Sequence, residues 1–380
     1  MAKRKKNEKG ERKMNRIILI GNGFDLAHGL KTSYKDFIDH LWYKIMNKAM
    51  TNSRGFYEDD LIKLDFPSNF LDTILYNTNN LEYKGLFFIN QIKEYRKKYS
   101  SSSVKLEFII KNKFLRDITN NLYIKNWVDI EEEYYKALID CKNNKDNVKL
   151  LNNEFQYIKN ALEDFLILQE KESLNINENI YNNIYSPILP NDFIEKQNDV
   201  NIEKMQFIVF NYTNTVKHYS KPNDTVIDFA YIHGQFKNPN NPIVFGYGDE
   251  RDDYYEQIEK ANNNELMKNI KSFNYLQTDI YRKAIHFLDD NDFQVYIMGH
   301  SCGTSDRTLL NTILEHENCK SIKIFYFIKK NEDGSKYVSF NDTAINLSRN
   351  FSKENKQRMR NIIVPLKHST TLTGNSNEKT

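Results

Sequence analysis

The chain of 380 residues has little cysteine, and its cysteines are not arranged as metal ligands. Cys141, Cys302 and Cys319 are odd in number and form no Cys-x-x-Cys pair. This usage disfavours a disulfide framework and a cysteine-based zinc site, and it is typical of a reducing compartment. We therefore expect a cytoplasmic protein without zinc.

Long apolar runs and a strong net charge are also lacking. No apolar run approaches the roughly 20 residues that span a bilayer, so we expect no membrane partner. The formal net charge of +3 is too small to imply a field that attracts nucleic acid to the whole protein. Basic residues gather between Lys3 and Lys13 without the apolar stretch of a secretory signal, which predicts a disordered basic tail over residues 1–14.

Two kinds of sequence alternate along the rest of the chain. Residues 15–50 and 201–366 combine short apolar runs with helical patterns, which predicts a Rossmann-like α/β core with a mostly parallel sheet flanked by helices. Residues 51–200 are charge-rich and mostly helical in pattern, and we interpret them as a large helical insertion after the first strand–helix unit. Residues 367–380 read as a polar tail.

These patterns give specific element boundaries. Strands are expected at Arg16–Gly21, Gln206–Phe210, Val226–His233, Pro242–Gly246, Phe293–Gly299, Ile322–Ile328 and Asn361–Pro365. Helices of the insertion are expected at Leu81–Tyr99, Ser103–Asn121, Asp129–Cys141 and Val148–Glu172.

The most informative motif is the segment from Ile17 to Leu30. Four consecutive apolar residues followed by Gly-x-Gly predict a buried strand that turns tightly into a helix. Backbone N–H groups at such a turn can bind a phosphate, and Asp25 and His28 add titratable side chains. The third glycine, Gly29, comes too late for the dinucleotide fingerprint, which disfavours an ordinary dehydrogenase. A purely structural β–α turn would use the same glycines.

Polar residues also follow later apolar strands, at the edge where open parallel sheets bind ligands. The Asn211 carboxamide suits ribose hydroxyls or a water, although Asn211 or Thr213 would equally cap the next helix. His233 ends a strand and can act as a general base near neutral pH, or can simply be a packed histidine. Gly246 beside Tyr247 indicates a mobile loop near a ligand or a plain turn.

Residues 299–303 match the Gly-x-Ser-x-Gly pattern of a nucleophile elbow. A serine hydrolase would use Ser301, Asp342 and His368. No HGGG-type oxyanion segment is visible and about two strands follow the serine, so this reading is disfavoured. The alternative is that Ser301 and Asp306 hydrogen-bond a ligand or cap the following helix.

An acidic cluster lies in the expected insertion, from Asp129 to Glu133. Asp129 with Glu132 fits a capping box at a helix N-terminus, where acids are favoured by the helix dipole. The functional alternative is that some of these carboxylates bind a divalent metal together with Asp25 or His28.

Taken together and in this order, the motifs resemble the abortive-infection AbiH family of bacterial anti-phage proteins. The resemblance runs from about Asn15 to about Leu366. It implies a phage-defence role with an unknown phage trigger. The matching segments are residues 19–30, 127–131, 210–213, 232–234 and 299–301.

A more distant resemblance is to sirtuin-like NAD-hydrolysing defence domains. Their pattern has Gly-Ala-Gly-x-Ser after the first strand, then Asn-x-Asp, His-Gly and Gly-Thr-Ser after later strands. The chain departs from it at Asp25, which replaces the serine, and at Thr213, which replaces the acid. Because the zinc-binding cysteines of sirtuin deacetylases are missing, protein deacylation is disfavoured.

The sirtuin-like resemblance implies NAD as the substrate and assigns roles to residues. Asn211 would orient the nicotinamide ribose and the attacking water, His233 would be the general base, and Asp25 would stabilise an oxocarbenium-like centre. The residues implied to hold the nucleotide are Gly21, Asn22, Gly23, Phe24, His28, Gly29, Thr213, Gly246, Gly299, His300 and Ser301.

Hydrolysis of NAD to nicotinamide and ADP-ribose is thus the favoured hypothesis, and two others stay open. One is a metal-dependent nuclease or phosphodiesterase that uses Asp25, His28, Asp129 and Glu131. The other is a nucleotide-sensing module without turnover. An unregulated NADase would kill its host, so we expect control by assembly, as a homo-oligomer or with a companion defence protein.

Overall fold

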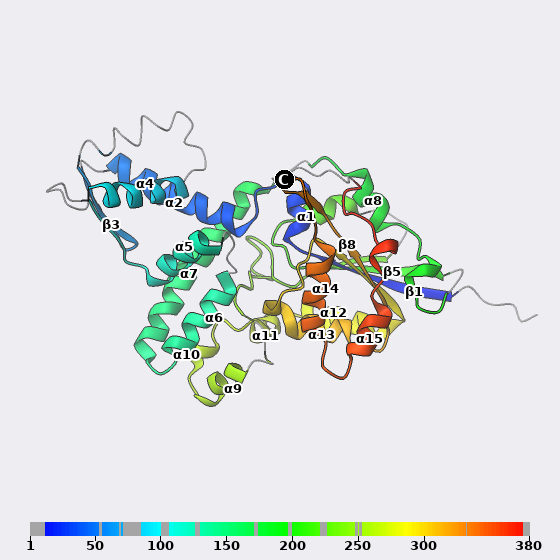
Figure 1. The fold of residues 1–380 in the computed structure, drawn as a ribbon. Coiled ribbons are helices and arrows are strands. Elements are labelled where there is room, and N and C mark those ends of the chain that lie inside the picture. Colours follow the sequence, from blue (N-terminus) through cyan, green and yellow to red (C-terminus); the bar gives the residue numbers. More distant parts are fainter. Residues whose placement is uncertain are drawn as a thin grey trace, which may run out of the picture.

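A five-stranded parallel sheet forms the centre of the computed structural model (Figure 1). The structure describes residues 12–52, 55–67, 70, 85–99, 106–125, 130–170, 174–196, 200–220, 226–247, 250, 253–331 and 333–374. The strands lie in the order β6-β5-β1-β7-β8. Their bounds are β1 (Arg12–Ile20), β5 (Val200–Val209), β6 (Val226–Tyr231), β7 (Phe293–Met298) and β8 (Cys319–Phe325).

The strand order places β1 at the centre of the sheet. From β1 the chain moves outward through β5 to β6 on one side, and through β7 to β8 on the other. The direction of winding reverses between β1 and β7. Ligands of open parallel sheets bind outside the carboxyl ends of the strands at such a reversal, so this edge is the place to look for a site. The α/β fold with a mostly parallel sheet is as expected.

The carboxyl halves of β1, β5, β6 and β7 are mainly apolar because both faces of the sheet are covered there. Ile17 and Leu19 of β1 face one hydrophobic cluster, and Ile18 and Ile20 face another, as the alternation of a strand requires. The first face is covered by α12 (Ile280–Asp290), α13 (Arg307–Leu314), α14 (Phe340–Asn350) and α15 (Lys356–Ile362). The second face is covered by α1 (Asn22–Ala27), η2 (Thr215–Tyr219) and α8 (Glu178–Ile184).

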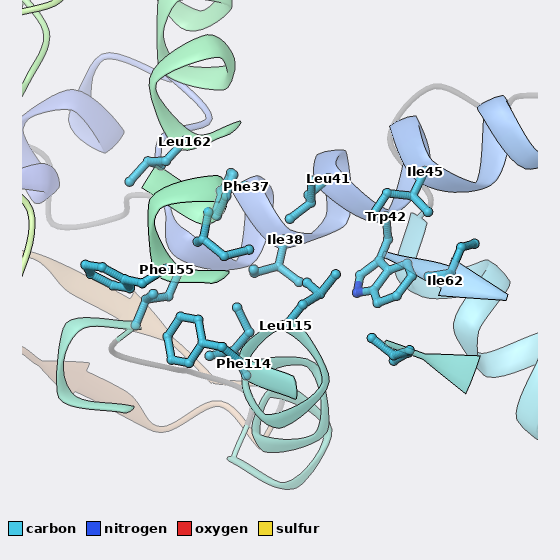
Figure 2. Packing of buried hydrophobic residues seen from close by; sticks show 14 of the residues in the cluster. Phe37, Ile38, Leu41, Trp42, Ile45, Ile62, Phe114, Leu115, Phe155 and Leu162 are labelled. Carbon is cyan, nitrogen blue, oxygen red and sulfur yellow. The ribbon is translucent and has the colours of Figure 1, made fainter. Parts of the chain in front are cut away.

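A second hydrophobic core lies beside the sheet in a mainly helical region (Figure 1). In Figure 2, Ile38 and Trp42 of α2 point toward Leu115 of α5, and Trp42 Nε1 donates a hydrogen bond of 2.9 Å to Thr119 Oγ1. The helices are α2 (Tyr34–Asn52), α4 (Gly85–Lys98), α5 (Lys113–Lys125), α6 (Ile130–Cys141) and α7 (Lys145–Gln169). Short helices α9 (Asp253–Lys260) and α10 (Asn264–Met267) pack against the same core.

This region is not purely helical. It contains an antiparallel sheet of β2 (Phe56–Glu58), β3 (Ile62–Asp65) and β4 (Glu107–Ile110). The expected helix Ser103–Asn121 is therefore wrong at its start, since the described residues form β4 before α5 begins. Whether residues 51–200 are an insertion stays an interpretation.

Two expected strands are wrong. Pro242–Gly246 is an irregular loop whose Phe245 stacks on Phe155 of α7, with ring centroids 5.0 Å apart. Asn361–Pro365 is the end of α15 with a single bridge from Ile363 to β8. In both cases the apolar residues are buried against other elements without forming a ladder, which an apolar run alone does not reveal. Among the described residues, none of the helices combines the length and apolarity needed to cross a membrane.

Two turns at the carboxyl edge of the sheet meet through glycines. Gly299 has a φ of +74°, and a Cβ there would lie 2.1 Å from the backbone nitrogen of Phe24. A Cβ on Gly21 would lie 2.5 Å from Cα of His300. The Gly23 N–H donates to the Gly299 carbonyl at 2.8 Å. The Gly-x-Gly pattern is thus required for contact between the turns after β1 and β7.

We predict that Gly299→Ala destabilises the protein much more than Gly334→Ala. Both glycines have positive φ, but a Cβ on Gly334 would meet nothing within 4 Å. Both variants incur the left-handed backbone cost of roughly 1–2 kcal/mol. Gly299→Ala must also push two turns apart, so its loss of unfolding free energy should be at least about twice as large. Denaturant unfolding measures both, and equal losses would contradict the close contact.

Candidate functional site

The carboxyl ends of four adjacent strands carry the principal residues expected from the sequence. Gly21 follows β1, Gly299 follows β7, and Asn211 and His233 come two residues after β5 and β6. Since these strands are parallel neighbours, the residues lie along one edge of the sheet. The polar side chains at and near these strand ends form two buried groups.

The first group consists of Asp25, Asn211, Thr213 and Thr215, and we call it the Asp25 group. Thr213 Oγ1 donates to Asp25 Oδ2 at 2.7 Å, and Thr215 Oγ1 donates to Thr213 Oγ1 at 3.3 Å. Asp25 Oδ1 and Asn211 Nδ2 are buried without a hydrogen-bond partner of normal geometry. Buried polar atoms without partners are rare and costly, so this pair is a candidate for contact with a ligand.

The electrostatics of the Asp25 group are dominated by burial. Burial raises the pKa of Asp25 to about 6, although the nearby Thr213, Thr215 and Asn211 side chains lower it. A carboxyl group with this pKa changes its charge just below neutral pH.

The second group consists of Glu131, His233, Lys271, His300 and Asp306, and we call it the Asp306 network. Asp306 Oδ1 accepts hydrogen bonds from His233 Nε2 and from Lys271 Nζ, each at 2.9 Å. Lys271 Nζ also donates to Glu131 Oε2 at 2.7 Å. His300 Nε2 lies 3.6 Å from Asp306 Oδ2. All five residues are buried.

The charges in the Asp306 network determine its protonation. Burial alone would raise the pKa of Asp306, but Lys271 and then His233 outweigh burial and hold this pKa well below its usual range. Burial and then Lys271 lower the pKa of His233. A neutral His233 that donates from Nε2 to a carboxylate has its lone pair on Nδ1. His300 Nδ1 accepts from the Cys302 N–H at 3.0 Å, so its Nε2 carries the proton facing Asp306.

Segments far apart in the sequence assemble the Asp306 network. Asp306 ends the short helix η4 (Thr304–Asp306) after β7, and Lys271 begins α11 (Lys271–Asn274). Glu131 lies in the first turn of α6, where its Oε1 accepts from the Gly246 N–H at 3.3 Å. The Lys271 N–H donates to the Tyr247 carbonyl at 2.9 Å. The network therefore joins the sheet edge to the helical region.

Both groups lie within the part of the chain that matches a known family. The family described as "Bacteriophage abortive infection AbiH" matches residues 17–328. The chain belongs to the AbiH family. A search of curated proteins found no match. AbiH membership implies a role in abortive infection, in which an infected cell is stopped before phage is released.

In this AbiH chain the glycine turn is closed by its neighbour. The N–H groups of Gly21 and Gly23 donate to the carbonyls of Met298 and Gly299, at 3.3 Å and 2.8 Å. Phosphate binding by these two amides would require the turns to separate. That role stays a prediction.

Several other residues expected to hold nucleotide have local partners. His28 Nδ1 donates to the Phe24 carbonyl at 2.7 Å, and His28 Nε2 accepts from the Tyr219 hydroxyl at 2.6 Å. Asn22 Oδ1 accepts from Thr32 Oγ1 at 2.6 Å. Gly29 has a φ of +71° and open space around it. The observed contacts of His28 and Asn22 thus explain the positions of these two side chains without a ligand.

The serine-hydrolase residues do not come together. Ser301 is exposed, Asp342 of α14 accepts from the Tyr337 hydroxyl, and His368 lies in η5 (Leu366–His368). None of the hydrogen bonds between described residues joins Ser301, Asp342 and His368.

The residues named for a metal site are also separate. Glu131 pairs with Lys271, whose ammonium also pairs with Asp306. His28 contacts Tyr219, and Asp129 lies outside the described residues. Over the described ranges, no three His, Cys, Asp or Glu side chains are placed to hold a metal ion.

Sequence reasoning missed Lys271 altogether and gave Asp306 only a ligand-bonding or capping role. Lys271 follows no strand and belongs to no motif. Asp306 comes three residues after the Gly-x-Ser-x-Gly match, and this position after a strand-end turn is the one signal that could have drawn attention to it.

We predict that the stability difference between the wild type and Asp25→Asn depends on pH. The pKa of Asp25 is raised from 3.8 to about 6, so the folded state binds more protons than the unfolded state between these values. The stability from protonated Asp25 is complete below pH 3.8 and is lost as pH rises through about 6. Asparagine does not titrate, so Asp25→Asn should gain about 3 kcal/mol relative to the wild type between pH ~4 and ~7. Denaturant unfolding at several pH values measures this, and a constant difference would contradict it.

Proposed function

We propose that this AbiH protein acts in the cytoplasm as an anti-phage effector that hydrolyses the nicotinamide–ribose bond of NAD. One observation carries the proposal. The ends of the adjacent strands β1, β5 and β6 bring the buried carboxyl of Asp25, the buried amide of Asn211 and the Asp306-paired His233 to one edge of the sheet. These are the groups that cleavage of an N-glycosidic bond requires.

A second observation supports the likeness to sirtuin-like domains. Compared with their pattern, the chain has an acid at Asp25 instead of a serine, and a hydroxyl at Thr213 instead of an acid. These two residues are in contact, since Thr213 Oγ1 donates to Asp25 Oδ2 at 2.7 Å. Relative to that pattern, the carboxylate and the hydroxyl have exchanged positions, and in this chain they join the ends of β1 and β5 through a hydrogen bond.

The proposed reaction follows from the chemistry of these groups. The bond between ribose C1′ and the nicotinamide nitrogen breaks, and its electron pair neutralises the pyridinium. Ionised Asp25 stabilises the oxocarbenium-like centre left at C1′. Asn211 orients a ribose hydroxyl and the attacking water through its donor and acceptor atoms. His233 Nδ1 takes the proton of the water as its oxygen bonds to C1′.

The imidazolium formed in this step suits the charge balance of the Asp306 network. With both histidines neutral, the network has the negative charges of Glu131 and Asp306 and the positive charge of Lys271. A proton on His233 balances the remaining negative charge, and Asp306 accepts its Nε2–H throughout. Asp306 therefore offsets part of the cost that burial and Lys271 impose on the imidazolium.

Substrate access requires movement. Asp25, Asn211 and His233 are each less than a tenth exposed, and the turns after β1 and β7 are in contact. We infer that phage infection leads to opening of this edge, with control by assembly. This would prevent NAD loss in uninfected cells.

The decisive test follows cellular NAD during infection by a phage that the wild-type protein blocks. Cells carry the wild type, Asn211→Ala, His233→Ala or the control His316→Ala, a histidine that precedes β8 and contacts Asp289. We expect NAD to collapse after infection in wild-type and control cells. Loss of the base should slow NAD loss about 100-fold or more and abolish protection.

The other outcomes discriminate among functions. Protection with steady NAD would contradict NAD hydrolysis. If purified protein then binds NAD without releasing nicotinamide, the chain is a nucleotide sensor. Loss of protection specific to Asp25→Ala and Glu131→Ala, with DNA or RNA cleavage that a chelator stops, would instead favour the nuclease hypothesis.

A further inference from the structure

The Lys271 ammonium is fully buried and lies between two acidic side chains. The Lys271 side chain is 0% exposed, and those of Glu131 and Asp306 are 6% and 10% exposed. Removing an ammonium from water is costly, so it is found in an interior only with close partners of opposite charge. The two carboxylates satisfy this requirement, and they come from α6 and from the turn after β7.

Lys271 and His233 donate hydrogen bonds to the same oxygen atom of Asp306. Both donate to Asp306 Oδ1, each over 2.9 Å. The position of this oxygen decides whether His233 donates from Nε2 and keeps its lone pair on Nδ1. Lys271 therefore acts on the candidate base through Asp306, since none of the hydrogen bonds between described residues joins Lys271 to His233 directly.

Glu131 is itself held on both oxygens. Its Oε2 accepts from Lys271 at 2.7 Å, and its Oε1 accepts from the Gly246 N–H at 3.3 Å. One turn further along α6, Tyr135 stacks on Tyr247, with ring centroids 4.0 Å apart. A Cβ on Gly246 would lie 1.9 Å from the Asn269 carbonyl oxygen, so the loop lies directly on the segment that leads to Lys271. Helix α6 thus fixes both Glu131 and the segments around Lys271.

We propose that Lys271, held by Glu131 of α6, is a positioning residue that fixes Asp306 Oδ1 against the Nε2–H of His233 and so directs Nδ1 of the base toward substrate. This role couples the N-terminal turn of α6 to the sheet edge. A displacement of that turn would move Lys271 and release Asp306. The catalytic consequence rests on the proposed function, but the coupling itself can be measured without NAD.

The test uses the full-length protein with ¹⁵N-labelled histidine, and NMR follows the titration of the His233 ring. The titratable side chains around this ring are Asp306, Lys271, His300 and Tyr212. A double variant, Glu131→Gln with Lys271→Met, removes one charge of each sign, so its net charge equals that of the wild type. We expect it to raise the titration midpoint of His233 by at least about one pH unit, because the nearby positive charge is gone.

Glu131→Gln alone should have the opposite effect. It keeps Lys271 but removes one of its two counter-charges, so the midpoint of His233 should fall. This single variant also covers the case in which the double variant does not fold. The matched control is Glu132→Gln, which changes the next residue on α6, a half-exposed acid that pairs with Lys136. The control should titrate like the wild type.

Opposite shifts in the two variants support the coupling, because a merely structural loosening would not change sign. Midpoints equal to the wild type in folded Glu131→Gln, or shifts of one sign in both variants, would overturn it. Cellular NAD distinguishes the two proposals. If the midpoints shift as expected but infected wild-type cells keep their NAD, the proposed function fails and the coupling stands. If wild-type cells lose NAD and the midpoints do not move, the coupling alone fails.

Discussion

The site depends on one buried carboxylate, Asp306. It accepts hydrogen bonds from His233 and Lys271 on the same oxygen, and His300 faces its other oxygen. These contacts connect the end of β6, the turn after β7 and the start of α11, and Lys271 extends the connection to Glu131 in α6. A buried ammonium that loses a partner typically costs about 3–5 kcal/mol, so the carboxylate stabilises the fold and orients the candidate base together. A substitution of Asp306 is therefore expected to affect both the stability of the fold and the orientation of His233.

Much of the sheet could be predicted because its strands are buried on both faces. Apolar runs that end at a glycine or a polar residue marked β1, β5, β6 and β7, and the parallel arrangement explains why Asn211 and His233 lie at one edge. The same reasoning failed for Pro242–Gly246. There, burial comes from aromatic stacking on the helical region, which the local pattern does not distinguish from a strand.

The charged part of the site could not be predicted in the same way. Lys271 lies 140 residues from Glu131 and 35 residues from Asp306 along the chain, so only the folded structure shows their pairing. The Asp25–Thr213 hydrogen bond spans 188 residues, and the sequence named both residues as candidates without indicating that they contact each other. Strand-end side chains can be placed from periodicity and topology, whereas long-range ion pairs depend on how elements pack against one another.

The arrangement at the sheet edge covers both groups of polar residues. The turn glycines hold β1 and β7 in contact, and the residues of both groups are covered. Under the proposed function, a site that has to open before it binds substrate would be a point of control in infected cells.

Hydrogen–deuterium exchange of Asp306→Asn, compared with the wild type, tests the central role of this carboxylate most directly. Asparagine keeps the shape but removes the charge that holds Lys271 and His233. The account predicts faster amide exchange in residues 244–247 and 269–274, with exchange in β1 and β5 unchanged. Unchanged exchange in those two segments, or a uniform increase across the whole sheet, would contradict it.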